Sequence, residues 1–470
     1  MEKYEKVGRF WAVDEDGNAL GEEQHGQLTF DPTAGGRLHT GEPLTTAGPS
    51  GRRPMLIWGS VDRIGRRVTL LHCFHLGGGS YIVNQAMDAG HFRHEEVFTK
   101  AVVRISDLPD WVDNDTIDID WHEPAEGESQ WSLKLNLTRP EPQTASFGRG
   151  TVTLRFAADY ERIDNESVKV VQCPQFEIEY AEPTNYSAIL NDVRNLQDLV
   201  SLCVDRTCFT DQVHVFREDL PEFSLAATPF PDTMRAVEIY VANRHHIAVP
   251  ERQKMDAIDM LASYGDVGGI DMIARWLDQA ADLHPVVGFL NSMRYTTEMY
   301  PENRFLNVCS AAEGFHRIAN PDQNYMGRPE FNLLKKSLKA LVPGEHRRWF
   351  AEAFNDHSNA PNLAARLTAM ATAVGNVSTA LVGDIDSWVK VVKKARNELT
   401  HLDNGRPEYS GADLLWLAES VYTVTRVCLL LHAGMGPALA LKIATRRPVW
   451  STRELVQAAV KTMAEQQGAK

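Results

Sequence analysis

Polar and cationic side chains gather near residue 400, in the run from Trp388 to His401. At 100° per residue this run predicts one helix with two contrasting faces. The apolar face suits a core and consists of Trp388, Val391, Val392, Ala395 and Leu399. The opposite face is polar and consists of Lys390, Lys393, Lys394, Asn397 and His401. The sequence therefore predicts an amphipathic helix that presents chemically useful groups to solvent.

Arg396 lies at the border of these two faces, where a long side chain can bury its stem and still expose its guanidinium. Asp403-Asn404-Gly405 should end the helix, which leaves His401 in the last turn, where a cation is favoured. A guanidinium, a carboxamide, an imidazole and several ammonium groups together suit a bound phosphate. A solvated basic face that happens to end in histidine is the simpler alternative.

The segment Arg396-Asn397-Glu398-Leu399-Thr400-His401 resembles the R-N-x-x-x-H signature of HEPN ribonucleases. The resemblance implies metal-independent RNA cleavage in which Arg396, Asn397 and His401 are catalytic and a 2′-hydroxyl attacks the phosphorus. Lys390, Lys393 and Lys394 would then hold the RNA backbone. One imidazole is too few for two proton transfers, and HEPN proteins pair two protomers. We therefore expect a homodimer, an RNA substrate such as tRNA, and neither metal nor other cofactor.

The order of elements after residue 301 also resembles the HEPN domain of ApeA-type proteins. Early helices are expected over 304–318, 333–341, 345–354 and 363–373, followed by the signature helix at 384–401 and a long helix at 412–431. Glu313 falls where the first helix of ApeA-type HEPN domains commonly carries an acidic residue. We expect it to orient Arg396 or His401; a solvated glutamate is the alternative.

Residues 1–184 carry short alternating runs separated by Gly, Pro, Asp and Asn, which is typical of a β-sandwich or barrel. Phe10-Trp11, Gly26, Gly59 and Val68 to Phe74 in this part resemble the N-terminal domain of ApeA-type proteins. Residues 185–300 mix helical and strand patterns, with a helix expected from Gly269 to Leu283. We thus expect an α+β protein with a β-rich domain (1–184), a mixed connector (185–300) and a HEPN helical bundle (301–470).

Charge differs between the two ends of the chain. Residues 301–470 contain 21 Lys and Arg against 16 Asp and Glu, whereas residues 1–300 contain 27 against 47. RNA is a polyanion, so residues 301–470 would tolerate it and residues 1–300 would repel it. ApeA-type proteins are associated with anti-phage defence through growth arrest. The resemblance therefore implies that the acidic N-terminal region senses infection, with a phage-derived trigger as its partner, or restrains the nuclease.

Several features favour a cytoplasmic protein without a membrane segment. The longest apolar run, around Val427 to Leu431, is interrupted by Arg426 and His432, and the N-terminus lacks the apolar core of a signal peptide. The six cysteines are scattered and form no C-x-x-C pair.

Other motifs in the chain favour simpler interpretations. Gly77-Gly-Gly-Ser80 lacks the Lys-Ser/Thr of a P-loop and predicts a hairpin turn. His91-x-x-His94, His245-His246 and the acidic run Asp110 to Asp120 lack the spacing of a metal site. The alternative function is a non-catalytic HEPN-type protein that dimerises and binds a nucleotide or an acidic partner. A ligand-binding β-sandwich with a helical appendage is a third hypothesis.

Overall fold

The computed structural model describes residues 4–31, 34–45, 54–62, 65–114, 116–122, 132–162, 168–223, 229–241, 254–296, 298–401 and 409–468. Two compact units divide the chain. Unit 1 comprises residues 1–257, 263–265 and 269–278, and unit 2 comprises residues 258–262, 266–268 and 279–470. This division falls inside one long helix, α4 (Gly269–Tyr295). The domain boundaries expected at 184 and 300 remain predictions.

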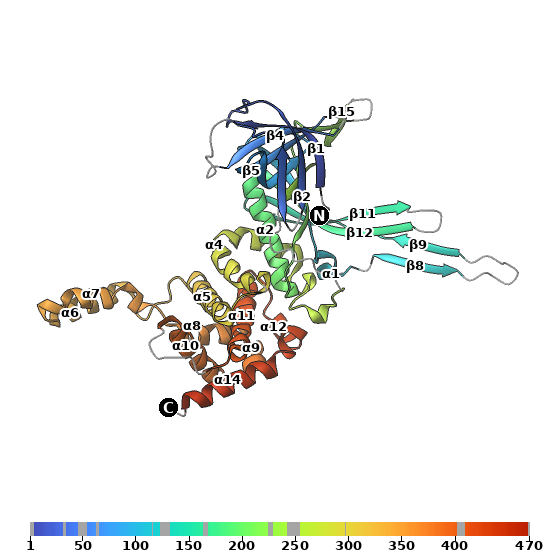
Figure 1. The fold of residues 1–470 in the computed structure, drawn as a ribbon. Coiled ribbons are helices and arrows are strands. Elements are labelled where there is room, and N and C mark those ends of the chain that lie inside the picture. The colour runs from blue at the N-terminus through green and yellow to red at the C-terminus, as the bar shows by residue number, and fades with distance from the viewer. Residues whose placement is uncertain are drawn as a thin grey trace. The chain divides into compact units, whose positions relative to one another are not determined.

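Unit 1 is built on a twelve-stranded antiparallel sheet with the order β10-β11-β12-β7-β13-β16-β6-β3-β2-β1-β4-β5 (Figure 1). An additional pairing of β5 with β6 closes strands β1 to β6 into a six-stranded barrel. The expected β-rich, barrel-like N-terminal region is confirmed. The barrel strands are β1 (Tyr4–Val13), β2 (Gln24–Asp31), β3 (Gly35–Thr40), β4 (Met55–Val61), β5 (Arg66–Gly77) and β6 (Ser80–Asp88).

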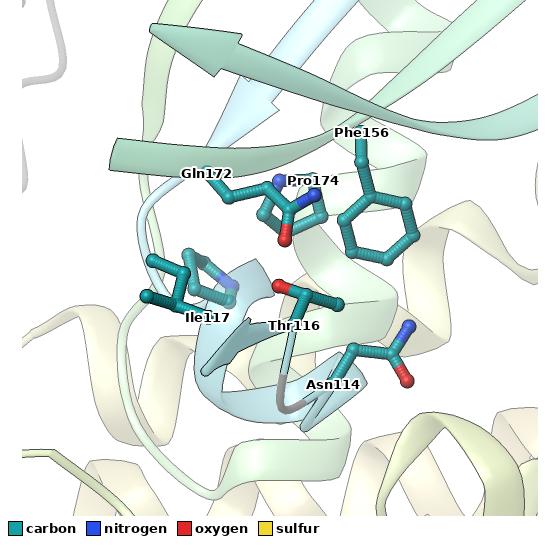
Figure 2. A pocket seen from close by; sticks show the side chains of 7 residues that line it. Asn114, Thr116, Ile117, Phe156, Gln172 and Pro174 are labelled. Carbon is teal, nitrogen blue, oxygen red and sulfur yellow. The ribbon is translucent and has the colours of Figure 1, made fainter. Parts of the chain in front are cut away.

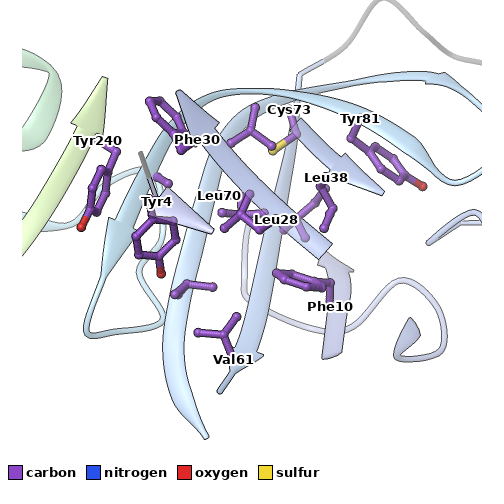
Figure 3. Packing of buried hydrophobic residues seen from close by; sticks show 14 of the residues in the cluster. Tyr4, Phe10, Leu28, Phe30, Leu38, Val61, Leu70, Cys73, Tyr81 and Tyr240 are labelled. Carbon is purple, nitrogen blue, oxygen red and sulfur yellow. The ribbon is translucent and has the colours of Figure 1, made fainter. Parts of the chain in front are cut away.

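Alternating side chains fill the barrel, because successive residues of a strand point to opposite faces. Figure 3 shows this core, in which Phe10, Leu28 and Leu38 are fully buried. Gly59 makes room for the Phe10 ring, since a Cβ at Gly59 would lie 2.6 Å from that ring. The predicted hairpin at Gly77–Ser80 joins β5 to β6, and both Gly77 and Gly78 have positive φ angles, which favour glycine.

The sheet continues beyond the barrel into the region that the sequence assigns to the connector. β13 pairs with β7 and β16, and β16 pairs with β6. The remaining strands are β7 (Val97–Ile105), β8 (Ile117–His122), β9 (Ser132–Leu137), β10 (Gln143–Phe147), β11 (Gly150–Arg162), β12 (Val168–Asn185), β13 (Thr210–Phe216), β14 (Pro221–Phe223), β15 (Pro229–Met234) and β16 (Val237–Val241). Three α-helices precede α4 in the described part of the chain: α1 (Leu108–Val112), α2 (Tyr186–Val204) and α3 (Tyr264–Val267).

The described part of unit 2 is helical. Its central helix, α11 (Gly411–His432), begins with a capping box between Ser410 and Asp413 and has Leu417, Val421 and Val424 fully buried. The other helices are α5 (Pro301–Ala319), α6 (Arg328–Leu341), α7 (Arg347–Ala353), α8 (Leu363–Val374), α9 (Asn376–Val382), α10 (Ile385–His401), α12 (Leu439–Ile443), α13 (Arg447–Trp450) and α14 (Arg453–Gly468). The expected C-terminal helical bundle is confirmed.

Two helices, α4 and α14, differ from expectation. The helix predicted from Gly269 to about Leu283 continues to Tyr295, through Pro285. Burial of Val286, Leu290 and Met293 beyond the proline supports the extension, because packing outweighs a single lost backbone hydrogen bond. Helix α14 is absent from the expected elements, although its buried residues Val456, Ala459, Val460 and Met463 have helical spacing.

Candidate active site

Helix α10 has the two faces that its sequence predicts. Trp388, Val391, Val392 and Ala395 are fully buried, and Leu399 is half-buried. The indole Nε1 of Trp388 donates a hydrogen bond to the buried Ser420 Oγ of α11 at 2.8 Å. This bond fixes α10 against the central helix, because an unpaired buried N–H is costly. Sequence periodicity identifies Trp388 as a core residue but gives no sign of its partner.

Glu313 of α5 forms an ion pair with Arg396 of α10. Its Oε1 lies 3.3 Å from Nη2 of Arg396, and the two side chains are 26% and 33% exposed. The pair leaves part of the guanidinium open to solvent while holding one of its nitrogens. Of the two partners that the sequence suggests for Glu313, the structure therefore places Arg396 in contact.

Asn397 and His401 are both exposed and lie four residues apart, which places them one helical turn apart on the same face. Arg396 Nη1 also lies 3.4 Å from the Asn397 side-chain oxygen. In the same turn, the Thr400 hydroxyl donates to the Arg396 carbonyl oxygen at 2.9 Å. The expected helix end at Asp403-Asn404-Gly405 lies outside the described residues.

The three predicted RNA-contacting lysines lie along the solvent-facing side of α10. Lys390 and Lys393 are exposed, and Lys394 is half-buried. Lys394 forms an ion pair with Glu398 at 3.8 Å, one helical turn away. A partly exposed pair of this kind is weak and can be replaced by a phosphate. The face therefore offers cations beside the Arg396, Asn397 and His401 groups.

A buried polar pair that no sequence pattern indicates lies one helical turn from Glu313. His316, three residues after Glu313 on α5, is 2% exposed, and its Nδ1 lies 3.3 Å from Nη1 of Arg366, which is 5% exposed. Burial, and then the nearby Arg366 charge, lower the pKa of His316. Burial also lowers the pKa of Arg366, whereas the charge of Glu313 raises it. Glu313 therefore interacts electrostatically with cations on both α8 and α10.

The described part of unit 1 has a pocket and several paired histidines; the Tyr186 hydroxyl lies 2.9 Å from His72 Nε2 and 3.5 Å from His94 Nδ1. Figure 2 shows a pocket of about 160 Å³ lined by neutral side chains only: Pro109, Asn114, Thr116, Ile117, Phe156, Gln172 and Pro174. The His91 ring stacks on Trp58 at 4.9 Å, and its Nε2 lies 3.0 Å from the Gly59 carbonyl oxygen. His245 and His246 lie outside the described residues. Over the part of the chain that the structure describes, no three His, Cys, Asp or Glu side chains are grouped to hold a metal ion.

One described helix, α11, is long and apolar enough to cross a membrane, but 78% of its apolar window is buried inside the protein. Arg426, which interrupts this run in the sequence, is itself fully buried, and its guanidinium lies 4.7 Å from the Tyr422 ring centroid. A central helix of a bundle accounts for the apolar character of α11.

Comparison with known protein families matches both parts of the chain. Residues 5–276 match the model described as ApeA N-terminal domain 1, and residues 306–437 match the model described as Apea-like HEPN. The second match contains Glu313 and all of α10. No curated protein and no solved structure matches the chain. Because the first model alone matches more than half of the 470 residues, the chain belongs to the ApeA family and carries an Apea-like HEPN domain.

Proposed function

We propose that this protein is a metal-independent endoribonuclease that uses the exposed face of α10. The single observation that carries the proposal is the arrangement of Arg396, held by Glu313 at 3.3 Å, beside the exposed Asn397 and His401 of the same helix. HEPN domains are typically ribonucleases, which supports a catalytic use of this face. A guanidinium fits the non-bridging oxygens of a phosphate, and histidine transfers protons near neutral pH.

In the proposed reaction, the 2′-hydroxyl oxygen of a ribose attacks the adjacent phosphorus. One His401 takes the hydroxyl proton, and a second imidazole gives a proton to the departing 5′-oxygen. Arg396 stabilises the charge that gathers on the non-bridging oxygens, and Asn397 orients the imidazole or the phosphate. The products are a 2′,3′-cyclic phosphate and a free 5′-hydroxyl. No oxidant or other reactant is consumed.

The second imidazole comes, in this proposal, from a second copy of the chain. A homodimer with two α10 helices facing each other would supply two His401 and two Arg396 side chains. Cleavage per chain should then fall when the protein is diluted below its dimerisation constant, in parallel with the dimer fraction measured by analytical ultracentrifugation. Cleavage by a strict monomer at an undiminished rate would contradict the pairing.

The test of catalysis compares the purified protein with its His401→Ala variant on total RNA, and then on tRNA, in EDTA. Wild-type cleavage should exceed that of the variant by about two to four orders of magnitude. The 3′ ends should carry cyclic phosphate. If both proteins leave RNA intact while still forming dimers, the non-catalytic alternative, a nucleotide- or partner-binding HEPN protein, replaces the nuclease proposal.

We further propose that the activity serves anti-phage defence by abortive infection, with the N-terminal region as sensor or restraint. The charge contrast between residues 1–300 and 301–470 supports a division of tasks. Expression of residues 279–470, the continuous part of unit 2, should change toxicity to the host relative to the full chain, in a His401-dependent manner. Equal toxicity with and without residues 1–278 would refute the regulatory role.

A further inference from the structure

Helices α6 and α7 form an arm between α5 and α8 that concentrates positive charge. The stretch from Arg328 to Glu352 contains six cationic and three acidic side chains, in a chain whose net charge is −15. Figure 1 shows the two helices beyond the packed ends of α5 and α8. The cations are Arg328, Lys335, Lys336, Lys339, Arg347 and Arg348.

The arm is a folded element with its own small apolar core. The Phe354 ring packs against Phe331 of α6 at 5.3 Å and against Phe350 of α7 at 5.4 Å, and Phe331 is 3% exposed. At its base, Asn359 is 5% exposed; its side chain accepts from the Met326 backbone N–H and donates to the Met326 carbonyl oxygen. These contacts hold α6 in a defined position, so its charges form a fixed surface.

On α6 the cations lie along one side of the helix. At 100° per residue, Arg328, Lys335 and Lys339 fall within a narrow stripe, with Lys336 about 80° to one side of it and the buried Phe331 about 60° to the other. From Arg328 to Lys339 the stripe is about 16 Å long, at 1.5 Å per residue. Lys335 pairs with Asp356 at 3.1 Å, whereas Arg328, Lys336 and Lys339 form no ion pair with a described residue. The stripe therefore keeps most of its charge for a partner.

Aromatic side chains are exposed on the same arm. Trp349 of α7 is 67% exposed, and Tyr325, just before α6, is 83% exposed. Exposed rings and cations on one arm match the two requirements of single-stranded nucleic acid, which are stacking surfaces for bases and positive charge for the backbone. Leu333 and Leu341 are also exposed, by 68% and 81%, which makes a second copy of the chain the competing occupant.

We propose that the α6–α7 arm is a second RNA-binding surface, which holds single-stranded RNA through Arg328, Lys336 and Lys339 and stacks a base on Trp349. This inference rests on the proposed RNA substrate and extends it. The lysines of α10 contact the backbone at the scissile phosphate, whereas the arm binds a more distant part of the strand. Charge and exposed rings together favour RNA over an acidic protein, because a single strand offers phosphates to the cations and bases to the rings.

The test measures binding separately from cleavage, with every protein carrying His401→Ala. A fluorescent single-stranded RNA of about 20 nucleotides, long enough to exceed one typical binding site, is titrated at several salt concentrations. The triple variant R328Q/K336Q/K339Q should bind about ten- to a hundredfold more weakly at 0.15 M salt, and the slope of log K against log salt should fall by about 2. Trp349→Ala should weaken binding and leave the slope unchanged.

Two controls separate the arm from general charge and from folding. Lys461→Gln removes an exposed lysine of α14, 78% exposed, and should change neither affinity nor slope beyond a twofold effect. The charge-preserving variant K336R/K339R should bind like the parent. Circular dichroism and the sedimentation coefficient establish whether each variant remains folded. If the triple variant unfolds, the single variants K336Q and K339Q are measured instead, and each should lower the slope of log K against log salt by about 0.7.

An unchanged affinity and slope in the folded triple variant would overturn the proposal. Variants that shift the monomer–dimer balance without altering RNA binding would also overturn it and would assign the arm to a second copy of the chain. Arm-dependent binding to anionic lipid vesicles but not to RNA would overturn it as well. If the wild-type protein cuts no RNA but arm-dependent binding persists, the nuclease proposal fails and the arm proposal stands. If the wild-type protein cuts RNA but the arm variants bind RNA normally, the nuclease proposal stands and the arm proposal fails.

Discussion

The contact between Glu313 and Arg396 gives a prediction in which stability and catalysis respond differently. Glu313→Gln keeps the shape of the side chain and removes its charge. The pair is 3.3 Å long, and its side chains are 26% and 33% exposed, so solvent screens it. A partly exposed pair contributes about 0.2–1 kcal/mol to the free energy of unfolding. The expected loss of stability is therefore small, and the variant should fold normally.

The expected effect on cleavage is larger, because Glu313 holds the guanidinium in position. Loss of a charge-stabilising donor lowers catalysis by about a hundred- to a thousandfold, and loosening one that remains should cost about tenfold. The assay is kcat/KM for a short RNA in EDTA, alongside urea unfolding of the same preparation. We expect a roughly tenfold slower Glu313→Gln with a nearly unchanged unfolding midpoint.

A double-mutant cycle shows whether Glu313 acts through Arg396. If it does, adding Glu313→Gln to Arg396→Ala should cause no further loss. Glu419→Gln is the matched control, since Glu419 accepts two hydrogen bonds from Arg294 of α4, at 2.9 and 2.8 Å, and none from Arg396. That variant should lose stability, by about 1–3 kcal/mol, and retain cleavage per folded molecule. Additive losses in the cycle, or full activity of Glu313→Gln, would refute the reasoning.

Three further predictions concern stability. Folding lowers the pKa of His316 below the ordinary histidine value of about 6.5. Below that pH the unfolded chain therefore binds more protons than the folded one. The free energy of unfolding should fall as the pH drops, by at most about 1.4 kcal/mol per pH unit. His316→Gln should reduce the difference between urea midpoints at pH 7 and 5.5, and an unchanged difference would contradict this. Ser420→Ala should cost about 1–3 kcal/mol by leaving the Trp388 N–H unpaired; an unchanged urea midpoint would argue against that bond. Gly59→Ala, whose Cβ would lie 2.6 Å from the Phe10 ring, should cost about 1–3 kcal/mol and lower the thermal midpoint by several degrees, whereas equal midpoints would disprove the close packing.

Local pattern determines several features of this protein without reference to the fold. The faces of α10 follow from residue order, because helical periodicity depends only on neighbours along the chain. For the same reason the sequence places Asn397 and His401 on one exposed surface and Trp388 in the core. The glycines at 77 and 78 likewise predict their hairpin, since positive φ angles favour glycine. The HEPN signature and the family resemblance are also properties of the sequence alone.

Tertiary structure decides the partners of these residues, because partners come from segments that are distant in the chain. Sequence leaves open whether Glu313 meets Arg396, His401 or solvent, and only the packing of α5 against α10 selects Arg396. The contact of His316 with Arg366 and the bond from Trp388 to Ser420 have no local pattern either. Barrel closure through β5 and β6 and the joining of β16 to the same sheet also depend on long-range pairing, which residue alternation cannot specify.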